Sequence, residues 1–244
     1  MGRWKGPLGI GERIDSPDKK RKFNELHFTA AASRYDLATR AMSLGRDQAW
    51  KKYLIASLPE VAAPVCVDLA CGTGDIAFLL AERFPEGRIT GIDLTEAMVR
   101  HANGRNRCAN VSFLCRDMAE TNFDDARIDI VTGGYALRNA PDLQQCLREV
   151  HRILKPGGCA AFLDFSKASR PLPQKGQYWL LKGWCGLWGT LLHANPTIHA
   201  YIADSLRQFP AREDYHRLAR QTGFTLVSSK LFYFGMLELL VLRK

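Results

Sequence analysis

Short apolar runs alternate with helical patterns from about residue 64 onward. The runs have the length and flanking turn signals of buried strands. They cover residues 65–70, 87–93, 111–115, 128–134 and 159–165. The segments between them predict helices over residues 76–84, 95–103 and 143–154. Alternating strands and helices indicate a parallel sheet with helices on both faces, so we expect a doubly wound, Rossmann-like α/β fold.

The helix predicted over residues 143–154 has the clearest ends. Asp142 stands where an N-cap would accept a hydrogen bond from the first turn. Lys155-Pro156-Gly157-Gly158 is typical of a segment that stops a helix and turns the chain. We therefore expect this helix to end there and lead by a turn into the fifth strand.

Further segments flank this core. We expect residues 1–27 to be a flexible, Lys/Arg-rich arm and residues 28–244 to be one domain. Residues 28–60 should form a helical cap, with a helix from about 36 to 57, and residues 167–210 a helical insertion on the substrate side. Polar helices near 198–208 and 212–222 precede two last strands at 224–229 and 236–243. The sheet then has seven strands, most of them parallel.

The composition is that of a globular protein with one sizeable core, since 46% of the 244 residues are apolar. No apolar run reaches the roughly 18 to 20 residues of a membrane span. The first residues do not contain the apolar central segment of a signal peptide, so we expect a cytoplasmic protein. The net charge of +9 favours an anionic partner, although a solvated basic surface explains it equally well. The seven scattered cysteines indicate neither a disulfide framework nor a metal site.

A glycine-containing loop follows the first strand. Gly72 and Gly74 let the backbone approach a ligand closely, and the next helix offers unpaired N–H groups. Asp93 ends the second strand, where a carboxylate can accept hydrogen bonds from both hydroxyls of a ribose. The spacing also fits a dinucleotide-binding loop, but Asp68 and Asp75 would repel a pyrophosphate and suit a cationic sulfonium.

Carboxylates thus follow consecutive strands, because the third strand leads into Asp117, which could accept from an adenine amine. Turn-forming or capping roles explain each carboxylate singly, but not their occurrence at one edge of the sheet. The set resembles the nucleoside-binding motifs of class I methyltransferases, which implies S-adenosylmethionine as the cofactor. The expected cofactor-binding residues are Asp68, Gly72, Thr73, Gly74, Asp93, Leu94, Asp117 and Met118.

Other motifs resemble a narrower family. They are Phe28-x-x-x-Ala32-x-Arg34-Tyr35-Asp36, Met42-Ser43-x-Gly45, Trp50-Lys51, Tyr135-Ala136-Leu137-Arg138-Asn139 and Leu163-Asp164-Phe165-Ser166-Lys167. They resemble the C-methyltransferases that act on ubiquinone, menaquinone and phylloquinone precursors, from about residue 28 to the end. The resemblance implies methylation of a reduced quinone ring. The residues of the last two motifs resemble most the members that act on naphthoquinones, which favours a prenylated naphthoquinol.

The chain departs from that family near the expected substrate entrance. Ala38 and Thr39 follow Tyr35-Asp36-Leu37 where Met-Asn is usual, and Asp47 precedes Trp50 where a His is usual. His199 also stands where a Tyr is common, and Asp164 where many members carry Glu. The ring is therefore left open, and another phenolic or polyketide natural product is the alternative substrate.

Ring-carbon methylation needs a carbon made nucleophilic by a deprotonated or strongly hydrogen-bonded ring hydroxyl. Arg138 is the first candidate to stabilise the phenolate or to orient a water that removes its proton, because a guanidinium is too basic to be the base. Asn139 can fix the other ring oxygen, and Tyr35 can close the site against water. His199 suits proton transfer near neutrality, although a surface histidine on a polar helix is an equal interpretation.

Residues 178–192 would form a helix that is apolar nearly all round. Such a helix suits a buried cap, a slot for a prenyl tail or a surface that touches lipid. We expect a quinol or phenol as the partner, with peripheral membrane contact and a homodimer left open. Binding to nucleic acid is not expected, because the sequence has no basic stripe with interleaved aromatics and no base-flipping loop. A non-methylating relative that keeps the cofactor loop is the remaining alternative.

Overall fold

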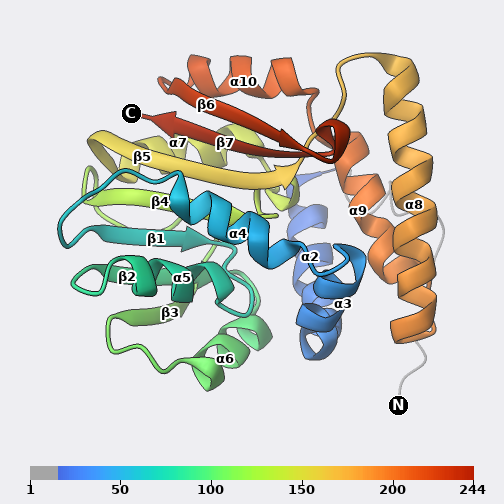
Figure 1. Cartoon of the computed structure of the whole chain (residues 1–244), viewed down its shortest axis with the longest axis horizontal. Helices are drawn as coiled ribbons and strands as arrows, with labels where there is room; N and C mark the ends of the chain where they lie inside the picture. Colours follow the sequence, from blue (N-terminus) through green and yellow to red (C-terminus); the bar gives the residue numbers. More distant parts are fainter. Residues whose placement is uncertain (1–15) are drawn as a thin grey trace.

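Seven strands form one sheet in the computed structural model, which describes residues 16–244 (Figure 1). The strands are β1 (Val65–Leu69), β2 (Arg88–Asp93), β3 (Val111–Cys115), β4 (Ile128–Gly134), β5 (Leu154–Phe165), β6 (Thr225–Phe232) and β7 (Leu237–Arg243). Their order is β3-β2-β1-β4-β5-β7-β6, with β1 to β5 parallel and β7 antiparallel to both neighbours. The predicted doubly wound, mostly parallel sheet is confirmed.

Helices connect and flank these strands. They are α2 (Pro17–Ala31), α3 (Tyr35–Met42), α4 (Asp47–Ala56), α5 (Asp75–Arg83), α6 (Glu96–Arg105), α7 (Leu143–Ile153), α8 (Pro171–His193), α9 (Thr197–Gln208) and α10 (Arg212–Gln221). Short 3-10 turns are η1 (Ala32–Arg34), η2 (Leu137–Asn139) and η3 (Tyr233–Gly235). The predicted cap of α7 is confirmed, because the Asp142 side chain accepts from the backbone N–H of Gln145 at 3.0 Å.

The core lies on both faces of the sheet because neighbouring strand residues point to opposite sides. Val67 packs in one buried cluster with Leu147 of α7, while the adjacent Cys66 packs in another with Leu80 of α5. All four side chains are fully buried. Helices α4, α5 and α6 thus cover one face and α7 the other.

Three segments differ from the sequence prediction. The helix expected over residues 36–57 is divided into α3 and α4, because Leu44 and Gly45 adopt left-handed backbone angles (φ 53° and 77°) that end a helix. Strand β5 begins at Leu154, so the expected turn at residues 155–158 lies inside a strand with a local irregularity in its pairing with β4.

The third difference concerns the basic arm expected over residues 1–27. Residues 1–15 lie outside the described part of the chain, but residues 17–27 belong to α2. Ser16 caps this helix, and Phe23 and Asn24 are buried. Most of the run of Lys and Arg therefore occupies the exposed side of a packed helix, while Lys20 is half-buried.

Two helical groups stand at the carboxyl ends of the parallel strands, α2 with α3 and α8 with α9 (Figure 1). The indole Nε1 of Trp184 in α8 donates to the carbonyl of Met42 in α3 at 2.9 Å and ties the groups together. Among the helices of residues 16–244, none has the length and apolar character needed to cross a membrane. These two groups enclose the space next to the sheet edge.

Candidate active site

The site lies where the strand order reverses direction. Because β1 and β4 are neighbours, the connections after them leave toward opposite faces and open a crevice at their carboxyl ends. A small cavity of about 50 Å³ occupies this crevice. Expected residues that line it are Tyr35, Gly72, Asp93, Leu94, Asp117, Met118 and Asn139. The sheet edge therefore brings most of the predicted cofactor residues together, whereas Asp68, Thr73 and Gly74 lie behind its wall.

The carboxylate of Asp93, which lines this cavity, is held in place by two backbone N–H groups. Its Oδ2 accepts from the backbone N–H of Gly72 at 2.9 Å, and its Oδ1 accepts from that of Thr95 at 2.8 Å. Burial raises the pKa of Asp93, and these two N–H groups oppose the rise. Each oxygen keeps a second lone pair, so the side chain can still accept two hydroxyl donors.

The backbone conformation at Gly74 shows why the loop requires a second glycine. Its φ of 93° is left-handed, and a Cβ there would lie 2.8 Å from the Phe113 ring. Any larger residue would be strained and would clash. Gly74 therefore shapes the turn into α5 rather than the cavity wall.

Asp68 has a buried oxygen with no partner among the described residues. Its Oδ1 accepts from the Thr132 hydroxyl at 2.8 Å, while Oδ2 accepts no hydrogen bond. Burial raises the pKa of Asp68 to about 7. An orphaned buried acceptor below the glycine loop fits a ligand that brings a positive charge, and an amino-acid tail with an ammonium group has that chemistry.

Asp117 is already engaged. Its Oδ1 accepts from the backbone N–H of Ala119 at 2.8 Å, and Arg21 of α2 lies 2.9 Å from its Oδ2. An adenine amine would therefore meet a carboxylate that α2 shares. Helix α2 also contributes Asn24 and Phe28 to the cavity wall, so it covers the crevice.

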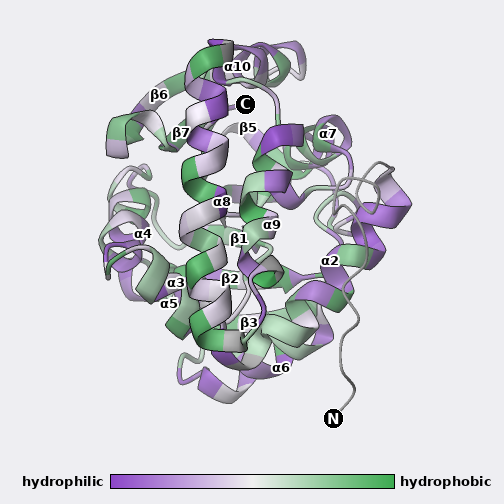
Figure 2. Cartoon of the chain, turned by 90° about the vertical axis from the view of Figure 1, so that its right-hand side faces the viewer, coloured by the Kyte–Doolittle hydropathy of each residue, from purple (hydrophilic) through white to green (hydrophobic). Residues whose placement is uncertain are grey.

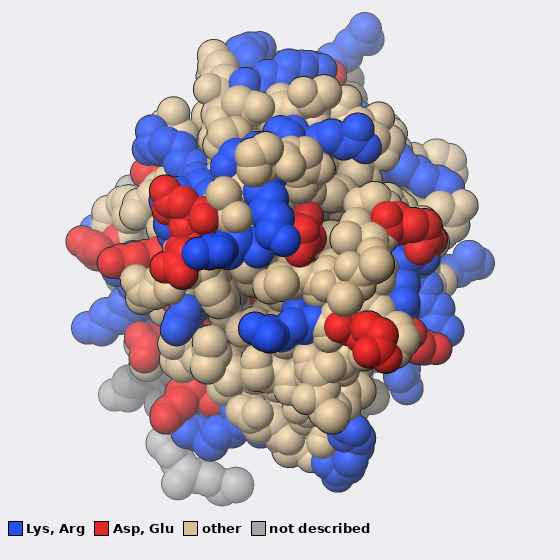
Figure 3. Space-filling model, turned by 90° about the vertical axis from the view of Figure 1, so that its left-hand side faces the viewer, with Lys and Arg blue, Asp and Glu red and all other residues tan. Residues whose placement is uncertain are grey.

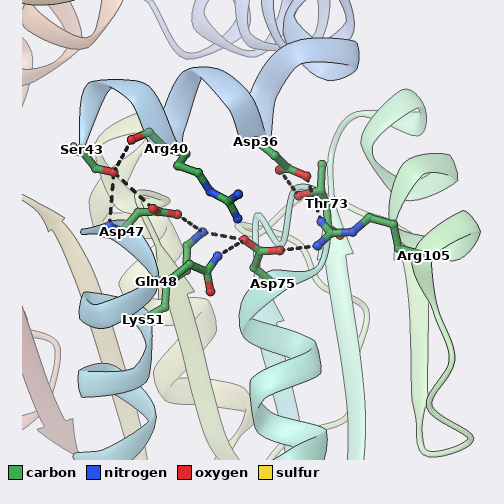
Figure 4. A network of polar contacts seen from close by, with 9 residues as sticks. All are labelled: Asp36, Arg40, Ser43, Asp47, Gln48, Lys51, Thr73, Asp75 and Arg105. Atoms are coloured by element: carbon green, nitrogen blue, oxygen red, sulfur yellow. Dashed lines mark hydrogen bonds and ion pairs between the residues drawn. The ribbon is translucent and has the colours of Figure 1, made fainter. Parts of the chain in front are cut away.

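A polar network fastens α3 and α4 to the glycine loop (Figure 4). Thr73 donates to Asp36 at 2.6 Å, and Arg105 reaches both Asp36 and Asp75. Asp75 also pairs with the buried Lys51 at 2.8 Å. Burial alone would raise the pKa of Asp75, but Lys51 and Arg105 outweigh it and hold the pKa at about 2. Thr73 and Asp75 thus hold the helical cap in place.

A second, much larger cavity of about 350 Å³ lies between α3, α8, α9 and the end of β7. Its size is in the range of cavities that bind small molecules. Apolar residues dominate its wall, and the polar side chains among its lining residues include His27, Arg138, His199 and Tyr201. Phe28, Tyr35 and Tyr135 line both cavities, so three aromatic rings form the boundary between them.

Arg138 is held in the wall of the large cavity by its hydrogen bonds. It is 4% exposed, and its Nη1 donates to the carbonyl of Tyr135 at 2.6 Å and to Oδ1 of Asp164 at 3.2 Å. Its Nε has no partner among residues 16–244. Burial raises the pKa of Asp164, and Arg138 opposes the rise. A buried guanidinium that keeps an unused donor beside a cavity can bind an oxyanion.

The adjacent Asn139 faces the small cavity instead. Its side-chain nitrogen donates to the carbonyl of Tyr135 at 3.0 Å, and its Oδ1 lies 3.2 Å from the Tyr201 hydroxyl. That hydroxyl also donates to Asn24 at 2.8 Å, and Asn24 donates to the carbonyl of Asn139 at 2.7 Å. Asn139 is thus tied into the contact between α2 and α9.

Tyr35 and His199 both line the large cavity but differ in setting. Tyr35 lines both cavities, and burial raises the pKa of its hydroxyl. His199 is buried on α9 and lines the large cavity, so it is not the surface histidine of the alternative interpretation. Both side chains can touch a molecule held in the large cavity.

Sequence reasoning missed Asn24, Tyr201 and Lys20. Burial and the nearby Arg138 lower the pKa of Lys20 to about 8. In the sequence this lysine is one of a basic run, and only the helical phase of α2 shows that it points inward. No local pattern of the sequence around Tyr201 assigns its hydroxyl to Asn24.

Comparison with known proteins gives a consistent result. Residues 17–241 match the ubiE/COQ5 methyltransferase family. The chain is 33% identical over 211 residues to the ubiquinone/menaquinone biosynthesis C-methyltransferase UbiE of Desulfotalea psychrophila. The aligned region covers 86% of each protein. It is 32% identical to a 2-phytyl-1,4-naphthoquinone methyltransferase of Nostoc punctiforme, covering 89% of this chain and 96% of the relative.

A solved structure supports the fold. The geranyl diphosphate C-methyltransferase of Streptomyces coelicolor A3(2) superposes with a TM-score of 0.63 at 16% identity, covering 80% of this chain and 75% of that one. At this identity the similarity bears on the fold alone.

Proposed function

We propose that this chain, which belongs to the ubiE/COQ5 methyltransferase family, methylates a ring carbon of a reduced, prenylated naphthoquinol of the demethylmenaquinone or demethylphylloquinone type. The family is one of quinone-biosynthesis C-methyltransferases, and S-adenosylmethionine is its methyl donor. When bound, this cofactor supplies a methyl group on a cationic sulfonium. The naphthoquinol is our specific choice within that family.

One observation carries the proposal: consecutive residues face the two cavities. Arg138 lines the large apolar cavity and Asn139 lines the small one, so the turn η2 stands between them. A ring placed against Arg138 would therefore have its reacting edge at the boundary with the cofactor site. A cavity of about 350 Å³ with an apolar wall has room for the ring and the first part of a prenyl tail.

The residues of the small cavity fit the cofactor. Asp93 offers two acceptor oxygens for ribose hydroxyls. Asp68 does not line the small cavity, but its unpartnered oxygen, buried below the glycine loop, suits an ammonium group. Gly72, Leu94, Asp117 and Met118 complete the wall on the nucleoside side. Arg21 would need to release Asp117, or share it, when the adenine amine is present.

Arg138 performs the main electrostatic task in this proposal. Its guanidinium favours deprotonation of a ring hydroxyl by stabilising the phenolate oxygen, and the phenolate is the form whose neighbouring ring carbon is nucleophilic. Asp164 holds the guanidinium in place through its side chain and backbone contacts. Tyr35 and the apolar wall exclude water, which strengthens these interactions. His199 is placed to accept the proton that leaves the ring.

The test is methyl transfer by the purified full chain, with radiolabelled S-adenosylmethionine and three acceptors. A reduced demethylnaphthoquinol should be labelled, whereas the same compound in its oxidised form should not, because a quinone has no nucleophilic ring carbon. A simple phenol serves as the third acceptor. Labelling of the phenol or of a polyketide but of no quinol would replace the proposed substrate by the alternative one.

A further inference from the structure

Several exposed apolar side chains lie along the outer side of α8. Figure 2 shows this helix in front, with hydrophobic residues distributed along its length. Leu172 is 81% exposed, Trp179 is 69% exposed and Leu191 is 64% exposed. With Leu180 and Leu187 they are spaced mainly by four and seven residues, so they share one side of the helix. Lys175 is the only charged residue among the exposed positions of α8 whose side chains the structure describes. Water-soluble surfaces rarely carry such a row without a partner.

The row continues onto two neighbouring turns. Leu44, between α3 and α4, is 67% exposed, and the tip of the β6–β7 connection carries Tyr233 and the fully exposed Phe234. Leu44, Leu180 and Tyr233 all line the large cavity as well. The mouth of the cavity is therefore built from the same exposed apolar residues. We call these eight residues the outer apolar surface: Leu44, Leu172, Trp179, Leu180, Leu187, Leu191, Tyr233 and Phe234.

The charged residues of α8 and its flanking segments have one sign. Residues 166–200, which include all of α8, contain four Lys or Arg and no Asp or Glu. Two of the four have internal partners, because Lys182 pairs with Asp204 and Lys167 donates to main-chain carbonyls. Arg170 and Lys175 are exposed, as is Arg46 next to Leu44. The face seen from the other side of the molecule instead shows acidic and basic side chains intermixed (Figure 3).

We propose that the outer apolar surface docks onto an anionic lipid bilayer and that the large cavity takes the prenyl tail directly from the acyl chains. Trp179 and Phe234 enter the interface, while Arg46, Arg170 and Lys175 contact lipid phosphates. Exposed aromatic and aliphatic residues beside Lys and Arg, on a helix that carries no acidic residue of its own, are what an interfacial helix presents to lipid. The role given to the cavity rests on the proposed function, whereas the docking itself rests on the surface alone.

Vesicle sedimentation of the full chain tests the docking. We expect binding to vesicles of phosphatidylcholine mixed with phosphatidylglycerol, weaker binding to phosphatidylcholine alone, and release by salt because the lipid charge is screened. Trp179→Glu and Phe234→Asp should each reduce partitioning by about tenfold, since a charge replaces an apolar anchor. Both positions are exposed, so folding should be retained, and circular dichroism checks this. Val227→Glu is the matched control, because Val227 is 50% exposed but lies at the other end of β6.

Two results would overturn the inference. One is sedimentation of both variants with anionic vesicles as complete as that of the parent. The other is a dimer in solution that Trp179→Glu converts to a monomer without any vesicle binding by the parent, which would make the surface a contact between two copies of the chain.

Activity separates this inference from the proposed function. If both hold, the variants methylate a short-tailed quinol in solution at the parent rate and lose activity on a long-tailed quinol embedded in vesicles. If the parent binds vesicles through this surface but labels no quinol, the docking stands and the proposed substrate fails.

Discussion

Nη1 of Arg138 lies 3.2 Å from Oδ1 of Asp164, and the backbone N–H of the same arginine donates to Oδ2 at 3.1 Å. Both side chains are buried, so one carboxylate fixes both the backbone and the guanidinium of the residue that faces the large cavity. This arrangement leads to the first prediction.

Arg138→Lys should slow methyl transfer to a reduced naphthoquinol by tenfold or more, equivalent to about 1.4 kcal/mol of barrier. Lysine keeps the charge but loses the planar fork that can hold Asp164 and an oxyanion together. Cofactor affinity should stay unchanged, because Arg138 does not line the small cavity. Single-turnover transfer and calorimetry measure the two effects separately. The exposed Arg148→Lys is the control; transfer at the parent rate by Arg138→Lys would make Arg138 structural.

Asp93→Asn should weaken S-adenosylmethionine binding by at least tenfold. A hydrogen bond to a charged acceptor contributes roughly 1.5–3 kcal/mol, and the amide retains only one acceptor oxygen for Gly72, Thr95 and the ribose. Calorimetry on the variant gives the affinity, with the exposed Asp124→Asn as the reference. Equal affinities for parent and variant would remove Asp93 from the cofactor site.

Asp68→Asn should change how stability depends on pH in the absence of cofactor. Burial raises the folded-state pKa of Asp68 to about 7, while the unfolded chain keeps the ordinary value near 3.8. The contribution of Asp68 to the free energy of unfolding is therefore fully present below pH 3.8. It is lost as the pH rises to about 7, by about 1.4 kcal/mol per pH unit. Urea unfolding at several pH values should show that the free energy of unfolding of the variant increases relative to that of the parent from pH 5 to pH 7. Above pH 7 the difference should stay constant. A difference between the two proteins that is independent of pH would mean that Asp68 stays ionised.

Tyr201→Phe should loosen α2. The hydroxyl is buried and donates to Asn24 at 2.8 Å, with Asn139 3.2 Å away, so its removal leaves buried amide oxygens without a donor. Such a loss costs about 1–3 kcal/mol. Hydrogen exchange of the α2 amides should become faster, whereas the exposed Tyr53→Phe should leave it unchanged. Identical exchange in α2 for both variants would show that other contacts hold this helix.

The sheet and the glycine loop could be predicted because each depends on short-range pattern. Apolar runs, the Asp142 cap and the turn around Gly72 are encoded within a few residues, and the order of parallel strands then places their ends at one edge. Asp93, Asp117 and Asn139 reach a common cavity for that reason.

The cap and the two cavities could not be predicted in the same way. Asn24, Tyr201 and Asn139 are far apart in sequence, and their contact depends on how α2 and α9 dock, which no local spacing fixes. The division between α3 and α4 depends on left-handed backbone at Leu44, a residue type that seldom adopts it. Lys20 shows the same limit, since burial of a lysine in a basic run follows only from the packed helix.

The two cavities are covered by different parts of the chain. Helix α2 covers the small cavity, where Arg21 pairs with Asp117 and Asn24 contacts Asn139, while exposed residues such as Leu44 and Leu180 line the large cavity. Helix α2 carries none of the residues of the outer apolar surface. If the proposed docking holds, the cofactor side therefore stays turned to the water, and cofactor exchange would not require the protein to leave the bilayer.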